Sequence, residues 1–473
     1  MNNDLRIQER HRLSNIGWAA ESVKAFRHKH FIENYIPGQV IYNLGEYPAK
    51  FKIEPTEYDF NQMKEFREHG VGLIQIHEEW NDSQRMHGAD KFSCPDPKGL
   101  DRFIDMAHAY DIKVIPYISS GFFQYTDPDY TTDFSTSPAH LRQIHFDYMN
   151  CSPRSAAWWK YLMGKLRQVL DSHDFDGLYN DIGYDFGDFF NRYAADNNGT
   201  PSYDWLDQIN NNLCRIFEPE LLPYDPYLED LLLQISNLVH EQKGIYKVHF
   251  CMNFLPRIET KFYDYYWVGE AIDNIRYLKR CRDYKPYLVP CPDYSIGTVD
   301  EDAFFAMTIP YMQFPLQAGG RPITGERALV PGVEYLPREQ DQQLDYYLKV
   351  NEWYKAHPDG PHVFGGQWYG TEGREGTQER WFKYFDLYRP MVKNGSWSYL
   401  EIQEANFLNG KLPEDMVVSL FINEKKYLVI ANHGDSSKEI SVKGEWIDRE
   451  SGGKVVTCRV EPMRLRFLEA CEG

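Results

Sequence analysis

The chain alternates short apolar runs with longer segments of helical periodicity, and this alternation constrains its fold more than any other feature. The pattern is typical of βα units, in which strands lie parallel and a helix crosses over between them. Eight runs are predicted as strands, and eight parallel strands close a barrel. They are Gln39–Glu46, Val71–Glu79, Ile112–Ser120, Asp176–Asp181, Ile245–Asn253, Tyr265–Glu270, Tyr287–Asp293 and Tyr311–Gln317. The last run also fits the end of a helix that starts near Asp300.

Helical patterns fill the spaces between the early strands, at Tyr58–His69, Lys98–Tyr110 and Ala156–Ser172, and two more follow at Gln340–Ala356 and Gln378–Lys393. From about Ser396 the pattern changes to short alternating strands separated by Asn-, Asp- and Gly-rich turns, such as Met416–Phe421, Lys426–Ala431 and Lys438–Val442. The sequence therefore predicts an α/β fold with three parts. These are an N-terminal lead-in segment (1–37), a (β/α)8 TIM barrel (38–395) and a C-terminal antiparallel, β-sandwich-like domain (396–473).

Composition narrows the class of protein. The formal net charge of −19 argues against nucleic acid as a partner, because phosphates demand a basic surface. Aromatic residues make up 15% of the chain, which suits a carbohydrate ligand, since sugar rings pack on flat aromatic faces. No secretion signal and no membrane-spanning stretch is visible, and the eight cysteines form no CxxC pair. We expect a cytoplasmic protein with reduced thiols and no membrane partner; its oligomeric state stays open.

Carboxylates gather where the predicted strands end, which is where barrel enzymes keep their chemistry. The clearest case is the segment from Phe175 to Asp185, an apolar strand that ends in Asp181 and is followed by Asp185. Asp181 points out of the sheet in this pattern, so it is the leading catalytic candidate. Asp176 starts the same strand, so we expect it at the opposite end in a structural role. An N-cap remains the alternative for Asp181.

Glu270 is the second candidate. It follows Trp267 and a glycine, and a carboxyl group in a partly apolar pocket has the raised pKa that a general acid needs. Its neighbour Asp273 is the substitute for that role, and an acid in the first turn of a helix is the alternative for both.

Further polar and aromatic residues near strand ends are candidates for binding sugar hydroxyls. They are Glu46, His77, Glu78, Glu79, Trp80, Tyr179, Asp185, His249, Asn253, Trp267, Asp273 and Asp293. No HxH, HExxH or GxGxxG motif accompanies them, so the sequence predicts neither a metal nor a nucleotide cofactor.

A longer pattern runs through this region: Cys151-Ser152-Pro153, a helix with Trp158, Trp159 and Tyr161, and then Asp176-Gly177-Leu178-Tyr179-Asn180-Asp181. It resembles barrel glycoside hydrolases of the α-galactosidase-like clan, whose nucleophile follows the fourth strand and whose acid/base follows the sixth. The resemblance implies that Asp181 is the nucleophile and that Glu270 or Asp273 is the acid/base. Two departures mark the chain as divergent: the clan's lysine two residues before the nucleophile is Tyr179 here, and its usual acid is Asp.

The sequence thus predicts a glycosidase, retaining and exo-acting on an oligosaccharide or glycoside, with Asp181 and Glu270 as the catalytic pair. An inverting hydrolase that uses the same two carboxylates is one alternative. A catalytically silent barrel that binds glycans is another, because this barrel hosts many functions.

Overall fold

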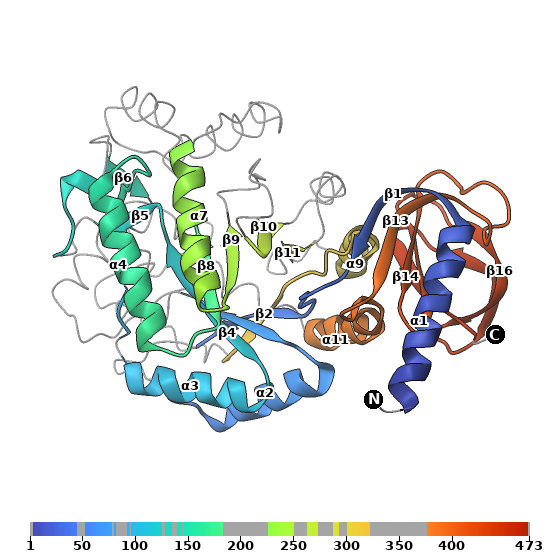
Figure 1. Ribbon diagram of the computed structural model, residues 1–473, viewed down its shortest axis with the longest axis horizontal. Helices are drawn as coiled ribbons and strands as arrows, with labels where there is room; N and C mark the ends of the chain where they lie inside the picture. Colours follow the sequence, from blue (N-terminus) through green and yellow to red (C-terminus); the bar gives the residue numbers. More distant parts are fainter. Residues whose placement is uncertain are drawn as a thin grey trace, which may run out of the picture.

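A computed structural model of the chain describes residues 3–44, 53–77, 80–81, 92–94, 96–124, 128–134, 140–143, 146–182, 226–249, 263–272, 287–292, 300–321 and 376–471. An eight-stranded parallel sheet curves into a barrel, and a seven-stranded sheet stands beside it (Figure 1). The barrel strands, in the order in which they pair, are β11 (Leu288–Pro292), β10 (Tyr265–Ile272), β9 (Ile245–His249), β8 (Gly177–Asp181), β4 (Lys113–Ser119), β3 (Leu73–Ile76), β2 (Gln39–Asn43) and β12 (Gln317–Gly320). Between the two ends of this order, the Leu316 N–H donates to the Pro290 carbonyl at 2.8 Å, which nearly closes the barrel.

The predicted strands lie where the sequence pattern indicated, except for the last one. Each run up to Tyr287–Asp293 coincides with one barrel strand, although β10 extends two residues past the predicted end at Glu270. The eighth prediction, Tyr311–Gln317, was wrong: this region follows α9 (Glu301–Thr308) and the 3-10 helix η4 (Ile309–Tyr311), and the strand begins only at Gln317. The side chain of Asp300 caps α9 by accepting a hydrogen bond from the Ala303 N–H, which confirms the helical alternative for this segment.

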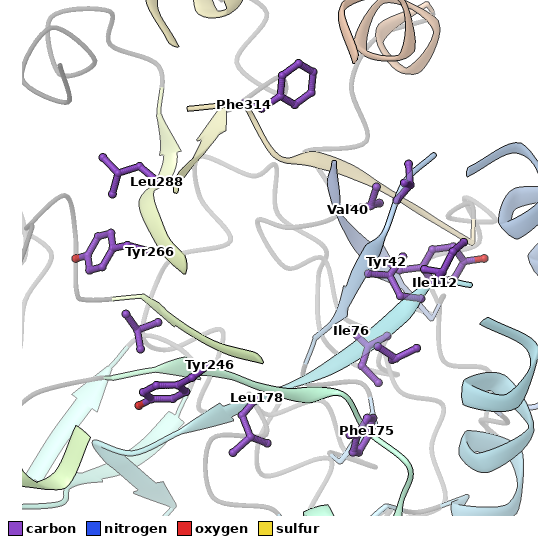
Figure 2. Packing of buried hydrophobic residues seen from close by; sticks show 14 of the residues in the cluster. Val40, Tyr42, Ile76, Ile112, Phe175, Leu178, Tyr246, Tyr266, Leu288 and Phe314 are labelled. Atoms are coloured by element: carbon purple, nitrogen blue, oxygen red, sulfur yellow. The ribbon is translucent and has the colours of Figure 1, made fainter. Parts of the chain in front are cut away.

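Helices cover the outer surface of the barrel (Figure 1). They are α2 (Glu57–His69), α3 (Pro97–Ala109), α4 (Ala156–Ser172), α7 (Pro226–Glu241) and α11 (Thr377–Tyr388), which continues into η6 (Arg389–Val392). Alternate strand residues face these helices, among them Tyr42, Leu178, Tyr246 and Tyr266, and they form the main apolar core (Figure 2). The helix predicted at Gln340–Ala356 lies outside the described residues. A small antiparallel sheet of β5 (Phe122–Gln124), β7 (Phe146–Asn150) and β6 (His140–Gln143), with η2 (Thr132–Phe134), is inserted after β4.

The antiparallel sheet combines one strand from the N-terminal part of the described chain with six from its C-terminal part. Its order is β1 (Val23–Phe31), β13 (Trp397–Ala405), β14 (Met416–Ile422), β15 (Lys426–Asn432), β18 (Arg464–Ala470), β16 (Lys438–Asp448) and β17 (Lys454–Val460). The N-terminal segment, expected to be a separate lead-in, therefore supplies the edge strand β1, while α1 (Asn3–Ser22) packs against the sheet. Alternation along β1 is obscured because Phe26 and Phe31, which point to opposite faces of the strand, are both exposed.

The antiparallel sheet packs against the barrel through one of its faces. On β14, Val418 and Leu420 belong to the apolar cluster on the α1 side, whereas Phe421 belongs to the main core of the barrel. The Ser419 hydroxyl donates to the Pro310 carbonyl at 2.8 Å on the same side as Phe421. The two parts consequently share one continuous apolar core.

Candidate active site

Asp181 ends β8 on the inner side of the barrel, at the carboxyl end of the strands. It is in register with Ser119 of β4 on one side and with His249 of β9 on the other. Two residues earlier, Tyr179 lies in the apolar cluster that fills the barrel interior. The side chain of Asp181 is 28% exposed, so its carboxylate is held at the barrel mouth with access to solvent.

Two side chains hold this carboxylate from neighbouring strands. The Tyr117 hydroxyl of β4 donates a hydrogen bond to Oδ2 of Asp181 at 3.1 Å. On the other side, Nδ1 of His249 lies 3.5 Å from Oδ1, at the outer limit of a hydrogen bond. Oδ2 is therefore oriented by a phenol, and Oδ1 is the less tightly held oxygen.

A layer of aromatic rings forms the floor beneath Asp181. Trp267 of β10 lies 4.9 Å from the ring of Tyr179, 5.2 Å from His249 and 5.7 Å from His77, which follows β3. His77 also stacks on Tyr117. All these rings are almost fully buried, so they form a rigid base that fixes the groups around the carboxylate.

Lys247 lies within this floor. It is in register with Tyr179, and its Nζ lies 5.6 Å from the centre of the Trp267 ring. The side chain is fully buried, and within the described residues its amine has no hydrogen-bond partner. Burial lowers the pKa of Lys247 to about 7, while the nearby Cys291 acts weakly in the opposite direction. Burial thus brings the pKa of this amine close to neutral pH.

An ion pair fixes the rim where β2 and β12 end. The guanidinium of Arg321, the residue after β12, contacts both carboxylate oxygens of Asp59 in α2, the nearer at 2.8 Å, and the Tyr42 hydroxyl donates to Asp59 at 2.5 Å. Burial alone would raise the pKa of Asp59, but the hydrogen bonds and charge of Arg321 outweigh it and hold that pKa below its usual value. Arg321 also donates to the carbonyls of Leu44 and Ile53, which anchors the chain on both sides of the loop after β2.

The structure brings together part of the predicted site. Asp181, Tyr179, His77, His249 and Trp267 converge at the barrel mouth. Glu270 lies on β10, where the pairing with β11 is irregular between Val268 and Ile272, and its side chain is outside the described part of the structure. Also outside the described residues are Glu46, Glu78, Glu79, Asp185, Asn253, Asp273 and Asp293.

Trp80 is not in the candidate site. Its indole is fully buried, donates to the Tyr117 carbonyl at 2.7 Å and packs against Phe175 in the outer core. The expectation that Trp80 binds substrate is corrected accordingly: a residue that follows a strand end can turn outward and serve packing.

Sequence reasoning missed Tyr117 and Lys247. Tyr117 looked like an ordinary strand residue, because only the pairing of β4 with β8 brings it next to Asp181. Lys247 could have been found from the sequence, since a lysine in the middle of the run Ile-Tyr-Lys-Val-His interrupts an apolar strand. Within the described residues, no group of three or more His, Cys, Asp or Glu side chains is arranged to hold a metal ion.

The chain matches no protein-family model and no curated protein sequence. It does match solved structures. A noncanonic maltogenic α-amylase from Thermotoga neapolitana aligns with a TM-score of 0.54 and 11% identity, over 93% of this chain and 100% of the amylase. Trehalose-6-phosphate hydrolase from Bacillus licheniformis aligns with a TM-score of 0.52 and 10% identity, over 93% and 100%. A GH36 α-galactosidase from Geobacillus stearothermophilus, in complex with stachyose, aligns with a TM-score of 0.50 and 10% identity, over 92% and 56%.

These likenesses show the fold. The chain has the barrel architecture of glycoside hydrolase structures, as the sequence predicted. The predicted combination of a TIM barrel with a C-terminal β domain is confirmed. None of the described helices has the length and apolar character needed to cross a membrane.

Proposed function

We propose that this protein is a retaining glycoside hydrolase in which Asp181 is the nucleophile and Glu270 the acid/base. The observation that carries the proposal is the oriented, partly exposed carboxylate of Asp181 at the carboxyl end of a barrel strand. The fold shared with glycoside hydrolase structures supports the same reaction class.

The chemistry follows from the two carboxyl groups. Asp181 attacks the anomeric carbon while the bond to the leaving oxygen breaks and Glu270 donates its proton to that oxygen. Glu270 then removes a proton from water, which attacks the same carbon and releases Asp181. Tyr117 holds Oδ2 of Asp181, so Oδ1 is the oxygen that forms and then loses the covalent bond.

The proposed substrate is an oligosaccharide or a simple glycoside, cleaved from one end. The matched structures include enzymes named for α-linked substrates, an α-amylase and an α-galactosidase. A panel of nitrophenyl α- and β-glycosides therefore comes first, and we expect turnover of at least one α-glycoside.

Asp181→Asn is the decisive variant, because the amide keeps the shape of the carboxylate and loses its nucleophilicity. We expect kcat to fall at least roughly a thousandfold, which corresponds to an increase of about 4 kcal/mol in the activation free energy. Azide should restore turnover of an activated substrate and yield a glycosyl azide. If the purified variant keeps more than about a tenth of the activity, Asp181 is not the nucleophile.

Asp176→Asn is the matched control. Asp176 stands at the opposite end of the barrel, where it accepts hydrogen bonds from the Val114 N–H at 2.8 Å and from Lys113 Nζ at 2.9 Å. This variant should lower the melting temperature and leave kcat unchanged. A product of inverted configuration would favour the inverting alternative, and saturable sugar binding without turnover of any glycoside would favour a silent barrel.

Glu270→Gln tests the second role. Activated aryl glycosides need little protonation of the leaving group, whereas sugar leaving groups need full protonation. The variant should therefore lose far more activity on a disaccharide than on a nitrophenyl glycoside. Equal losses on both would move the acid role to Asp273 or to the pair Glu78 and Glu79.

A further inference from the structure

A cavity opens at the end of the barrel opposite Asp181. Its volume is about 710 Å³, within the range of small-molecule sites. The amino ends of β4, β9 and β10 form one side, through Lys113, Ile245 and Tyr265. Two connecting segments between the barrel and the antiparallel sheet, 34–37 and 389–394, form the other.

Basic side chains dominate this cavity, although the chain as a whole carries a net charge of −19. Lys113, Lys243, Arg389 and Lys393 line it together with His240, and Asp264 is the single acidic residue among the described residues of the lining. One carboxylate oxygen of Asp264, Oδ2, lies 2.9 Å from Nε2 of His240 and accepts the Tyr246 N–H at 2.8 Å. One carboxylate is outnumbered by four lysine and arginine side chains, so the described lining carries a net positive charge.

Among the described residues, two of these cations have an ion-pair partner and two have none. Lys113 binds Asp176 and Lys393 binds Glu424, both at 2.9 Å. Lys243 and Arg389 have no ion pair or hydrogen bond to any described side chain. Two free cations that face the same concave space are a suitable arrangement for an anion.

The backbone adopts the left-handed conformation next to Arg389, at Gly70, and at Lys243 itself. Gly70 ends α2 in the left-handed region at φ 82°, and a Cβ there would lie 1.9 Å from Nη1 of Arg389, so the glycine makes room for the guanidinium. Lys243 occupies the corresponding position after α7, at φ 58°, where glycine is the favoured residue. A lysine costs roughly 1 kcal/mol more than glycine at such a position.

The connecting segments are held in place before any ligand binds. The Ile36 N–H donates to the Tyr265 hydroxyl at 2.8 Å, and the Asn34 N–H donates to the Asn394 side chain at 2.8 Å. Apolar side chains of Ile36, Pro37 and Val392 share the lining with the cations. The cavity is thus preformed, with a charged part for an anion and an apolar part for an organic body.

We propose that this cavity binds a small molecule that carries a phosphate group, with Arg389 and Lys243 as its principal partners. The planar guanidinium matches two phosphate oxygens at once, and the ammonium adds a point charge. The site is independent of the hydrolase chemistry at the other end of the barrel, and its occupant ties the barrel to the segments that lead into the antiparallel sheet.

The test is calorimetric titration of the full chain with inorganic phosphate, glucose 6-phosphate and glucose, at constant ionic strength set with KCl. We expect saturable binding of both phosphates and none of glucose, with glucose 6-phosphate the tighter ligand. Lys243→Gly and Arg389→Gln should each weaken binding at least tenfold, and Lys411→Gln, at an exposed lysine of the antiparallel part, should not change it.

Lys243→Gly separates binding from folding. It removes a charge from the cavity while placing glycine where the backbone favours it, so the melting temperature should fall by no more than about 2 °C. Unaltered phosphate affinity in this folded variant would overturn the proposal. So would phosphate binding that KCl abolishes or that Lys411→Gln weakens equally. Glycosidase turnover should be the same in Lys243→Gly and in the wild type, so failure of either proposal leaves the other standing.

Discussion

The hydroxyl of Tyr117 reaches Oδ2 of Asp181 across two neighbouring parallel strands, at 3.1 Å. The pairing of β4 with β8 sets this contact, because Tyr117 is in register with Tyr179 and so lies one row below Asp181. A phenol donor stabilises the ionised carboxylate and selects one rotamer of it. The relationship makes Tyr117 the orienting partner of the proposed nucleophile.

Tyr117→Phe should therefore reduce kcat/KM by roughly tenfold to a hundredfold, since a hydrogen bond to a charged group contributes about 1.5–3 kcal/mol. The melting temperature should change little, because the ring remains packed. Tyr246→Phe is the matched control: its hydroxyl accepts from the Asn180 side chain at 2.8 Å on the outer face of the sheet. Its kinetics should be those of the wild type. Wild-type kinetics in Tyr117→Phe as well would remove the orienting role.

Lys247→Met should stabilise the protein by about 1–4 kcal/mol at neutral pH, because it replaces a buried amine that has no hydrogen-bond partner among the described residues with an apolar side chain of similar size. Burial lowers the pKa of Lys247 to about 7 from 10.5, so below about pH 7 the folded state carries the whole cost of a buried charge. As the pH rises from about 7 towards 10.5, the folded state loses the proton that the unfolded state keeps, and wild-type stability increases.

The advantage of Lys247→Met should accordingly be greatest below pH 7 and shrink steadily up to about pH 10. Urea unfolding at several pH values measures it, and Lys160→Met, at an exposed lysine of α4, serves as the control with no such trend. An advantage of equal size at pH 6 and pH 10 would mean that no charge is buried at this position.

Arg321→Met should destabilise the protein by about 3–5 kcal/mol, because it leaves the fully buried Asp59 without its counter-charge. In the wild type the lowered pKa of Asp59 makes its stabilising effect complete above the unfolded value of 3.8, and the effect is lost as the pH falls through the folded pKa. The deficit of the variant should thus narrow below about pH 4. Arg67→Met breaks the exposed pair with Asp111 and should cost less than about 1 kcal/mol.

Phe421→Ala tests whether the barrel and the antiparallel sheet unfold together. The ring is fully buried in the main core and lies 6.3 Å from Tyr388 of α11, so its loss should cost about 3–5 kcal/mol. We expect one cooperative transition at a lower temperature, measured by calorimetry. Val456→Ala, at a side chain that is 67% exposed, should leave that transition in place. Two separate transitions would show that the parts fold independently.

Local patterns predicted the barrel well because each strand and its following helix carry their own signals. The capping box at Thr56 and Asp59 and the left-handed Gly70 delimit α2 within one residue of its expected start. The prediction of the eighth strand was wrong for a local reason as well. Gln317-Ala318-Gly319-Gly320 has too few apolar residues to be recognised as a strand, and the apolar residues before it belong to a helix.

Other features depended on partners far away in the sequence. β1 reads as a polar segment, and only its pairing with β13 explains why it is a strand. Within the site, strand-end position selected Asp181, a partly exposed carboxylate, but it selected Trp80 equally, and that residue is part of the core. Position in the sequence says where a strand ends, and the packing of neighbouring strands decides which side chains meet there.

The pairing of the first strand with β13 has a consequence for synthesis on the ribosome. Asn34, just after β1, bonds to Asn394, just before β13, across 360 residues of sequence. At ribosomal rates of about 5–20 residues per second, that interval lasts roughly 20 to 70 seconds. During that interval β1, which carries Phe26 and Phe31, lacks β13, the strand with which it pairs in the folded protein. The unpaired edge of β1 is therefore a natural binding site for a holdase chaperone until β13 has been synthesised.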